Sequence, residues 1–235
     1  MKVRIKFAKE GAMKYVGHLD IMRYFQKAVR RADIPIAYSE GFSPHMIMSF
    51  AAPLGVGITS RGEYFDMELA QPMATGEIVR CLNETMVEGM EVLSARKVED
   101  GKASKAMSLV AGADYIIEFR EGREFCEDWW KKLEEYYKQP SIVVFKKTKR
   151  SERDVDIKPF IYKLSVQERK IFMQLAAGSS NNTKPELVMD GFAAYLGITP
   201  GEYAYTIHRQ EVYADMGKEG LVKLIPLEDL GEEVE

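Results

Sequence analysis

Apolar and polar residues alternate at the start of the chain, over residues 2–9. Because successive side chains of a strand point to opposite faces, this pattern predicts a half-buried strand. One face of the strand is apolar, and the outer face is basic, with Lys2, Arg4 and Lys6.

The period then changes to that of a helix over residues 18–32, where Leu19, Met22, Phe25 and Val29 recur at helical spacing. Asp20 in the first turn suits the positive end of the helix dipole. Pro35 follows the predicted end, where a proline commonly terminates a helix.

Alternation returns over residues 46–50 and 62–70, and a helical pattern over 76–88 precedes a further strand over 90–98. The predicted order is β-α-β-β-α-β, the split βαβ arrangement of a ferredoxin-like domain. We therefore expect residues 1–100 to form such a domain, followed by a linker over 101–112.

The order repeats less clearly in the second half of the chain. Its elements are a strand at 113–120, a helix at 123–138, a strand at 141–147, short segments near 160–165 and 169–176, a helix at 184–196 and a strand at 203–213. The sequence predicts an α+β protein of two tandem ferredoxin-like domains, the second over 113–225. Residues 226–235, with five acids, are expected to be an acidic, frayed tail.

Composition fits a globular protein, since 46% of the residues are hydrophobic and 29% are charged. The two cysteines, Cys81 and Cys126, are too far apart in sequence to indicate a disulfide framework or a zinc site. With no apolar run of membrane length and no signal-peptide pattern, the expected location is the cytoplasm.

Charge is distributed unevenly along the chain. The total is -3, but residues 1–50 hold nine Lys or Arg against four acids, a local charge of +5. A local basic patch is what matters for contact with nucleic acid. The candidate RNA-binding residues are Arg23, Lys27, Arg30 and Arg31 on the first helix, and Lys146, Lys147, Lys149 and Arg150 in a predicted hairpin; both sets can also be ordinary solvated surface.

His18 begins the predicted first helix, and His45 ends the loop that follows this helix. If His18 and His45 met at one end of the sheet, they could act as base and acid in RNA cleavage. Lys14 could then stabilise the developing negative charge. The alternative is that both histidines are structural.

A third candidate is an anion site before the helix at 184–196. Ser179, Ser180 and Lys184 stand where free backbone N–H groups of a helix start can hold an anion, although this is also an ordinary helix start. The spacing is not that of a phosphate-binding P-loop. No nucleotide fingerprint, metal-ligand pattern or cofactor motif is present in the sequence.

Five segments of the chain form a further pattern: Lys14–Asp20, Pro35–Pro44, Pro53–Gly57, Asp154–Ile161 and Gly178–Ser180. Together they resemble the radical-SAM-linked proteins, a bacterial family of unknown function. The resemblance spans nearly the whole chain and implies a radical SAM enzyme as the partner, but it brings no activity and no catalytic residues. The chain lacks the Cys-x3-Cys-x2-Cys triplet that holds the cluster of such an enzyme.

These observations predict an RNA-binding accessory module that works with a radical SAM enzyme in RNA modification or processing. Two alternatives stay open. One is a metal-independent endoribonuclease that uses His18 and His45. The other is a protein-interaction scaffold that docks the radical SAM partner through the loop 41–50 and the aromatic helix 123–138, without nucleic acid. The sequence does not give the oligomeric state.

Overall fold

The computed structural model describes residues 1–101, 104–147, 152–179, 181–218 and 220–235. The fold is α+β, with five α-helices among these residues. The chain divides into two compact units. Unit 1 holds residues 1–112 and 209–235, and unit 2 holds residues 113–208.

Unit 1 contains all of residues 1–100, the predicted first domain. Its elements are β1 (Lys2–Lys9), η1 (Gly11–Tyr15), α1 (His18–Arg31), β2 (Met48–Phe50), β3 (Thr59–Glu68), α2 (Thr75–Asn83), β4 (Met90–Lys97), α3 (Ala106–Leu109), β11 (Leu224–Pro226) and η3 (Leu227–Leu230). The predicted elements at 2–9, 18–32 and 90–98 are confirmed to within one residue.

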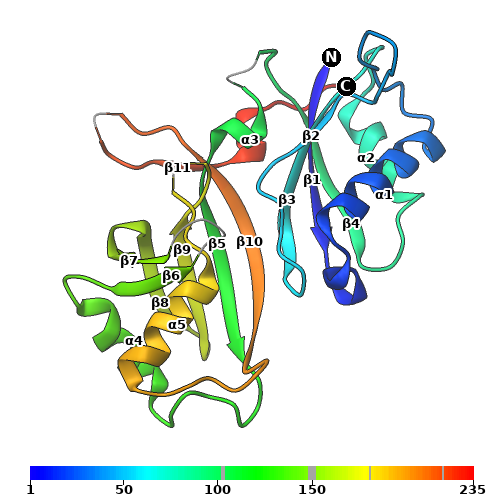
Figure 1. Cartoon of the computed structure of the whole chain (residues 1–235). Coiled ribbons are helices and arrows are strands. Elements are labelled where there is room, and N and C mark those ends of the chain that lie inside the picture. The colour runs from blue at the N-terminus through cyan, green and yellow to red at the C-terminus, as the bar shows by residue number, and fades with distance from the viewer. Residues whose placement is uncertain (102–103, 148–151, 180, 219) are drawn as a thin grey trace. The chain divides into compact units, whose positions relative to one another are not determined.

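β4, β1 and β3 are successive neighbours in the sheet of unit 1, β2 also pairs with β3, and these three pairs are antiparallel. α1 and α2 lie on one side of this sheet (Figure 1). The apolar positions of β1 face these helices and form a buried core with them. Phe7 packs edge to face on Phe25 of α1 at 4.6 Å between ring centroids, and Phe50 stacks on Phe65 at 4.9 Å.

The other face of β1 differs from the prediction. Lys2, Arg4 and Lys6 do not form a basic outer surface: Arg4 is 1% exposed and Lys2 is 5% exposed. Arg4 Nε donates to Asp66 at 2.8 Å, and Lys6 Nζ lies 2.6 Å from Glu211. Acidic residues distant in sequence therefore neutralise this face.

The predicted acidic tail also differs, because residues 226–235 are held in unit 1. Leu227 is fully buried, and its carbonyl accepts a hydrogen bond from Arg4 at 3.0 Å. Glu228 accepts from Lys6 at 2.5 Å and from Ser94 at 2.6 Å. Acids expected to be solvated at a frayed end are thus partners of sheet cations, while Glu235 remains exposed.

Unit 2 begins within one strand and ends within another. Its elements are β5 (Val110–Phe119), α4 (Trp129–Lys138), β6 (Val143–Lys147), β7 (Glu152–Asp156), η2 (Lys158–Phe160), β8 (Ile161–Gln167), β9 (Lys170–Ala176), α5 (Pro185–Leu196) and β10 (Tyr205–Asp215). The predicted second domain, 113–225, does not match this unit, because residues 209–225 belong to unit 1.

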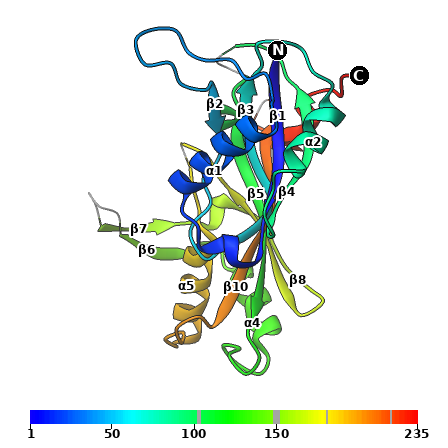
Figure 2. The same cartoon turned by 90° about the vertical axis from the view of Figure 1, so that its right-hand side faces the viewer.

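The strands of unit 2 also depart from a second βαββαβ order. β5, β9 and β8 are neighbours in a sheet, whereas β6 and β7 form a separate two-stranded sheet. Figure 2 shows β6 and β7 side by side, and β6 contacts α5. The order departs from βαββαβ because residues 152–176 hold three strands, β7, β8 and β9. Of these, β8 and β9 pair with each other as a hairpin.

Within the described parts of the chain, no helix is long and apolar enough to cross a membrane.

Candidate nucleic-acid interface

The four cations predicted on the first helix all lie on the exposed side of α1. Ile21, Phe25, Ala28 and Val29 are buried against the sheet. Arg23, Lys27, Arg30 and Arg31 are exposed. Their spacing of three and four residues places them along one stripe of the helix.

Contacts within the chain leave this charge largely unneutralised. Arg23 pairs with Asp20 at 3.1 Å, but both side chains are mostly in solvent, where such a pair contributes little. Arg31 donates to the carbonyl of Thr85 at 3.2 Å. Among the described residues, Lys27 and Arg30 form no ion pair, so their charge is available to a ligand.

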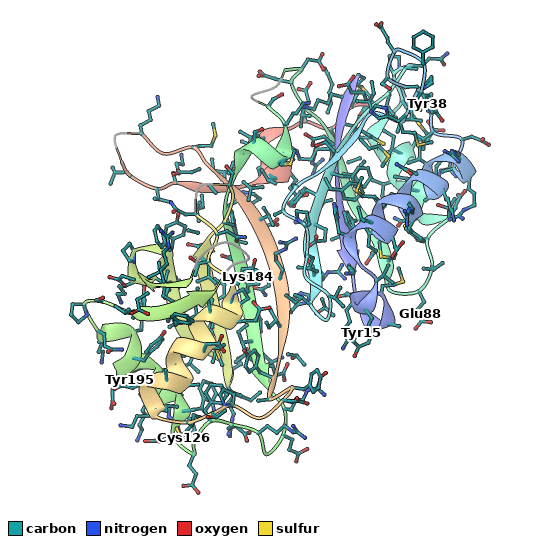
Figure 3. The ribbon with its side chains drawn as sticks, viewed as in Figure 1. Tyr15, Tyr38, Glu88, Cys126, Lys184 and Tyr195 are labelled. Atoms are coloured by element: carbon teal, nitrogen blue, oxygen red, sulfur yellow. The ribbon has the colours of Figure 1, made fainter. Side chains whose placement is uncertain are left out.

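Exposed aromatic rings lie near both ends of α1. Tyr15 ends the short 3-10 helix that precedes α1, with the Lys14 ammonium 5.2 Å from its ring centroid. Tyr38 follows α1 in the chain, and Figure 3 shows the two tyrosines beyond opposite ends of the helix. Both rings are about half exposed or more, and flat exposed rings are surfaces on which unpaired bases stack.

His18 lies in a small apolar cavity at the start of α1, with Lys9 and Glu63 also in its lining. Its volume of about 10 Å³ accommodates roughly one water molecule. Burial lowers the pKa of His18 below its usual 6.5, Glu63 opposes this and Lys9 adds to it. The His18 ring packs edge to face on Phe50 at 5.6 Å.

His45 lies elsewhere, on the exposed loop before β2. Its Nδ1 is 2.8 Å from the Ser39 hydroxyl, and its backbone N–H donates to the same oxygen at 3.1 Å. It lines a different cavity, which contains Lys2 but not His18. The two histidines are therefore not brought together into one site, and Lys14 stacks on Tyr15 instead.

The predicted basic hairpin is described only in part. Lys146 and Lys147 end β6, where they pair in register with Arg153 and Glu152. Lys149 and Arg150 lie outside the described residues.

The predicted anion site at α5 is also described in part. Ser179 and Lys184 are exposed, and Lys184 is the residue before the first turn of α5; Figure 3 shows Lys184 at this end of the helix. Ser180 lies outside the described residues. The nearby cavity of about 390 Å³ is lined by Asp154 and Asp156 as well as Arg153, so its charge does not favour an anion.

One feature was missed in the sequence, and a second was indicated only as part of a loop. The first is a buried charge cluster in which Arg209 donates to Glu63 at 2.9 Å, beside Lys9, which is 2% exposed. Burial lowers the pKa of Lys9, Glu63 opposes the change and Arg209 adds to it. No local pattern could show this cluster, because its members are more than 50 residues apart.

The second feature is the exposure of Phe42, in the loop 41–50 that the scaffold alternative uses; its side chain is fully exposed between Tyr38 and Met46. A bridge between these two residues closes the loop, and the Ser39 N–H donates to the carbonyl of His45 at 2.9 Å. Gly41 has φ of +106°, a conformation that favours glycine. The turn residues around Phe42 were a usable signal that it is displayed rather than buried.

Among the described residues, no group of three or more His, Cys, Asp or Glu is placed to hold a metal ion.

Comparison with protein-family models identifies the family of the chain. A family model described as "Uncharacterized protein conserved in bacteria (DUF2344)" matches residues 2–185. The chain belongs to this family. The DUF2344 match includes α1, β1 and the loop that carries His45 and Phe42, whereas Arg209, Glu211 and Glu228 lie beyond it.

No curated protein matches this DUF2344 chain. Among solved structures, a chain from "Crystal Structure of a Cbf5-Nop10-Gar1 Complex" is similar, with a TM-score of 0.48 and 10% sequence identity. The match covers 89% of this chain and 48% of that chain, so this chain spans about half of that chain's length. A likeness at this level carries no information about function.

Proposed function

We propose that this chain is an RNA-binding accessory protein that works beside a radical SAM enzyme in RNA modification or processing. The observation that carries the proposal is the exposed stripe of four cations on α1. The cations at the start of β1 are neutralised inside the unit, whereas α1 presents four cations to solvent along one stripe.

The dimensions of α1 suit a short length of single-stranded RNA. Its 14 residues extend over about 21 Å. Phosphates would contact Arg23, Lys27, Arg30 and Arg31, because phosphate contacts dominate the affinity of such interfaces. Tyr15 and Tyr38 would stack on bases at the two ends, a mode of recognition that tolerates different sequences.

The partner rests on the resemblance to radical-SAM-linked proteins. The chain has no Cys-x3-Cys-x2-Cys triplet, so in this proposal the cluster and its chemistry belong to the separate enzyme. The basic hairpin with Lys146, Lys147, Lys149 and Arg150 would supply further phosphate contacts.

The proposal is tested by fluorescence anisotropy with a labelled single-stranded RNA. The double variant Lys27→Gln/Arg30→Gln removes the two cations of α1 that form neither an ion pair nor a side-chain hydrogen bond with the described residues. Each exposed charge-assisted contact contributes on the order of 1 kcal/mol or less, so we expect binding about tenfold weaker at low salt.

The matched control is Arg61→Gln/Lys97→Gln, which removes the same charge. Both residues are exposed, but Arg61 is paired with Glu10 and Glu91, and Lys97 is paired with Glu232. The control should bind RNA nearly as the parent does. Equal losses of RNA affinity in both variants would show that binding depends on net charge rather than on α1. No RNA binding by the parent would overturn the proposal.

Phe42 favours a second candidate, a scaffold that docks the radical SAM enzyme without nucleic acid. A fully exposed phenylalanine on a closed loop is the kind of anchor that a partner protein buries at the centre of an interface. Phe42→Ser should then abolish capture of the enzyme and leave RNA affinity unchanged. Capture that survives nuclease treatment, from a protein that binds no RNA, would favour the scaffold.

The endoribonuclease alternative has no comparable support, because His18 and His45 line different cavities.

A further inference from the structure

A cavity of about 300 Å³ in unit 1 is not used by the α1 interface. Its lining includes Lys2, His45, Met46, Met48, Glu68 and Lys105, and we call it the Lys2 cavity. It is bounded by the start of β1, the residues before and within β2, and the end of β3. Its volume is at the lower end of the range for small-molecule sites.

Lys2 is a buried cation with incomplete pairing. It is 5% exposed, yet its Nζ lies 3.6 Å from Asp66 and 3.4 Å from the Ser104 hydroxyl. A well-formed charge-assisted hydrogen bond is about 2.7–2.9 Å long. The shorter contacts to Asp66 come from Arg4 Nε at 2.8 Å and from the Ala106 N–H at 2.8 Å. Lys2 thus retains capacity to donate to an anion.

His45 and Lys105 add donors to the same cavity. The Ser39 hydroxyl oxygen accepts from the backbone N–H of His45 and can donate its own hydrogen to Nδ1. That arrangement leaves the proton of a neutral ring on Nε2, as a donor. Lys105 is exposed at the rim. The lining holds two cations, Lys2 and Lys105, and two acids, Asp66 and Glu68, and the carboxylate of Asp66 is bound mainly by Arg4.

The remaining lining suits a planar base. Met46 is buried and Met48 half-buried, and thioether sulfurs make favourable contacts with aromatic rings. Glu68 forms no ion pair among the described residues, and a carboxylate can accept hydrogen bonds from the amino group of a base. The carboxylate of Glu68 would repel a bare phosphate ion, so the cavity favours a ligand that also carries hydrogen-bond donors.

We propose that the Lys2 cavity binds one nucleotide whose base carries an amino group. Its phosphate is held by Lys2, Lys105 and His45, and its base lies against Met46 and Met48 with the amino group donating to Glu68. The ligand is either a free nucleoside monophosphate or one nucleotide of an RNA strand. In the second case the inference rests on the proposed function and gives that function a base-selective site.

Calorimetric titration of the full chain with AMP, CMP, GMP and UMP tests the site. AMP, CMP and GMP should bind at least about tenfold more tightly than UMP, which lacks the amino group. Glu68→Gln should reduce this preference, and Lys105→Ala, at an exposed position, should weaken all binding about tenfold. Arg61→Gln, an exposed cation outside the cavity, should change nothing.

Two results would overturn the site: no binding of any mononucleotide, or binding that is equal for inorganic phosphate and for UMP. If no mononucleotide binds while RNA still binds through α1, the proposed nucleotide site is wrong and the proposed function stands. If mononucleotides bind while RNA does not, the cavity stands and the proposed function fails.

Single-stranded RNA then separates the two sources of the ligand. If Lys105→Ala weakens binding of RNA as well as of AMP, the cavity takes a nucleotide of the strand. If it weakens AMP alone, the ligand is a free nucleotide.

Discussion

The cations of β1 and those of α1 are both clustered in the first 31 residues, yet they have different environments. Lys2, Arg4 and Lys9 are each 5% exposed or less. Arg23, Lys27, Arg30 and Arg31 are exposed, and three of them, Lys27, Arg30 and Arg31, form no ion pair among the described residues. The two sets cannot be distinguished by charge count.

The difference shows what decides whether a basic residue is available to a ligand. A strand in a sheet can be covered on both faces, and a buried charge must then be paired because its desolvation is costly. A helix that covers a sheet keeps one side in solvent, where pairing is optional. The charge of an exposed helix face is therefore the better guide to a nucleic-acid interface.

The largest expected effect comes from breaking a buried pair of β1. Asp66→Ala leaves Arg4 and Lys2 buried without their acid, so we expect the free energy of unfolding to fall by about 3–5 kcal/mol. Lys27→Ala on α1 should change it by less than about 0.5 kcal/mol. Denaturant unfolding measures both, and equal effects would contradict the comparison.

A middle-sized effect is expected at Lys6, which bridges Glu211 at 2.6 Å and Glu228 at 2.5 Å. Lys6→Met leaves two carboxylates without their cation and should cost about 1–3 kcal/mol. Adding Glu228→Gln should recover part of the loss. A double-mutant cycle with no coupling would show that the bridge does not stabilise the fold.

The same network predicts a dependence of stability on pH. Burial acts to raise the pKa of Glu228, but hydrogen bonds from Lys6 and Ser94 outweigh it, and the pKa lies below its usual 4.5. A lowered carboxyl pKa contributes stability above the unfolded value that is lost as the pH falls through the folded value. The stability difference between the parent and Glu228→Gln should therefore shrink as the pH falls from about 6 to about 3. A constant difference would contradict the assignment.

The smallest effect is expected at His18, beside the buried Lys9. Its ring signals in NMR should titrate below the usual 6.5, because burial disfavours the charged ring and Lys9 repels it. Its neutral form then contributes stability at higher pH that is lost as the pH falls below 6.5. Lys9→Met should raise the pKa of His18, and no change on this substitution would place Lys9 too far away to act.

Local pattern predicted much of the fold of unit 1. β1 and α1 were predicted almost to the residue, because each has a single clear period and α1 also has terminal signals. The hairpin of β6 and β7 was not recognised as a separate sheet, because alternation shows that a strand exists but not which strand pairs with it. The association of residues 209–235 with unit 1 depends on partners such as Lys6, more than 200 residues away from Glu211 and Glu228.

The candidate sites were predictable to a smaller extent. The stripe on α1 followed from helical spacing, and only its exposure had to be seen in the structure. The Lys2 cavity could not be predicted, because it combines Lys2, residues 45–49 and Lys105 from separate elements. The sequence left open whether His18 and His45 are adjacent, since a shared position at loop ends does not fix which cavity a side chain lines; they line different cavities.

The most direct test of the account is the salt dependence of RNA affinity for the parent and for Lys27→Gln/Arg30→Gln. Each phosphate neutralised on a single strand adds about 0.7 to the slope of log affinity against log salt concentration. If the cations of α1 contact phosphates, the slope of the double variant should be shallower by about 1.4. An unchanged slope would show that RNA, if bound, does not lie on α1.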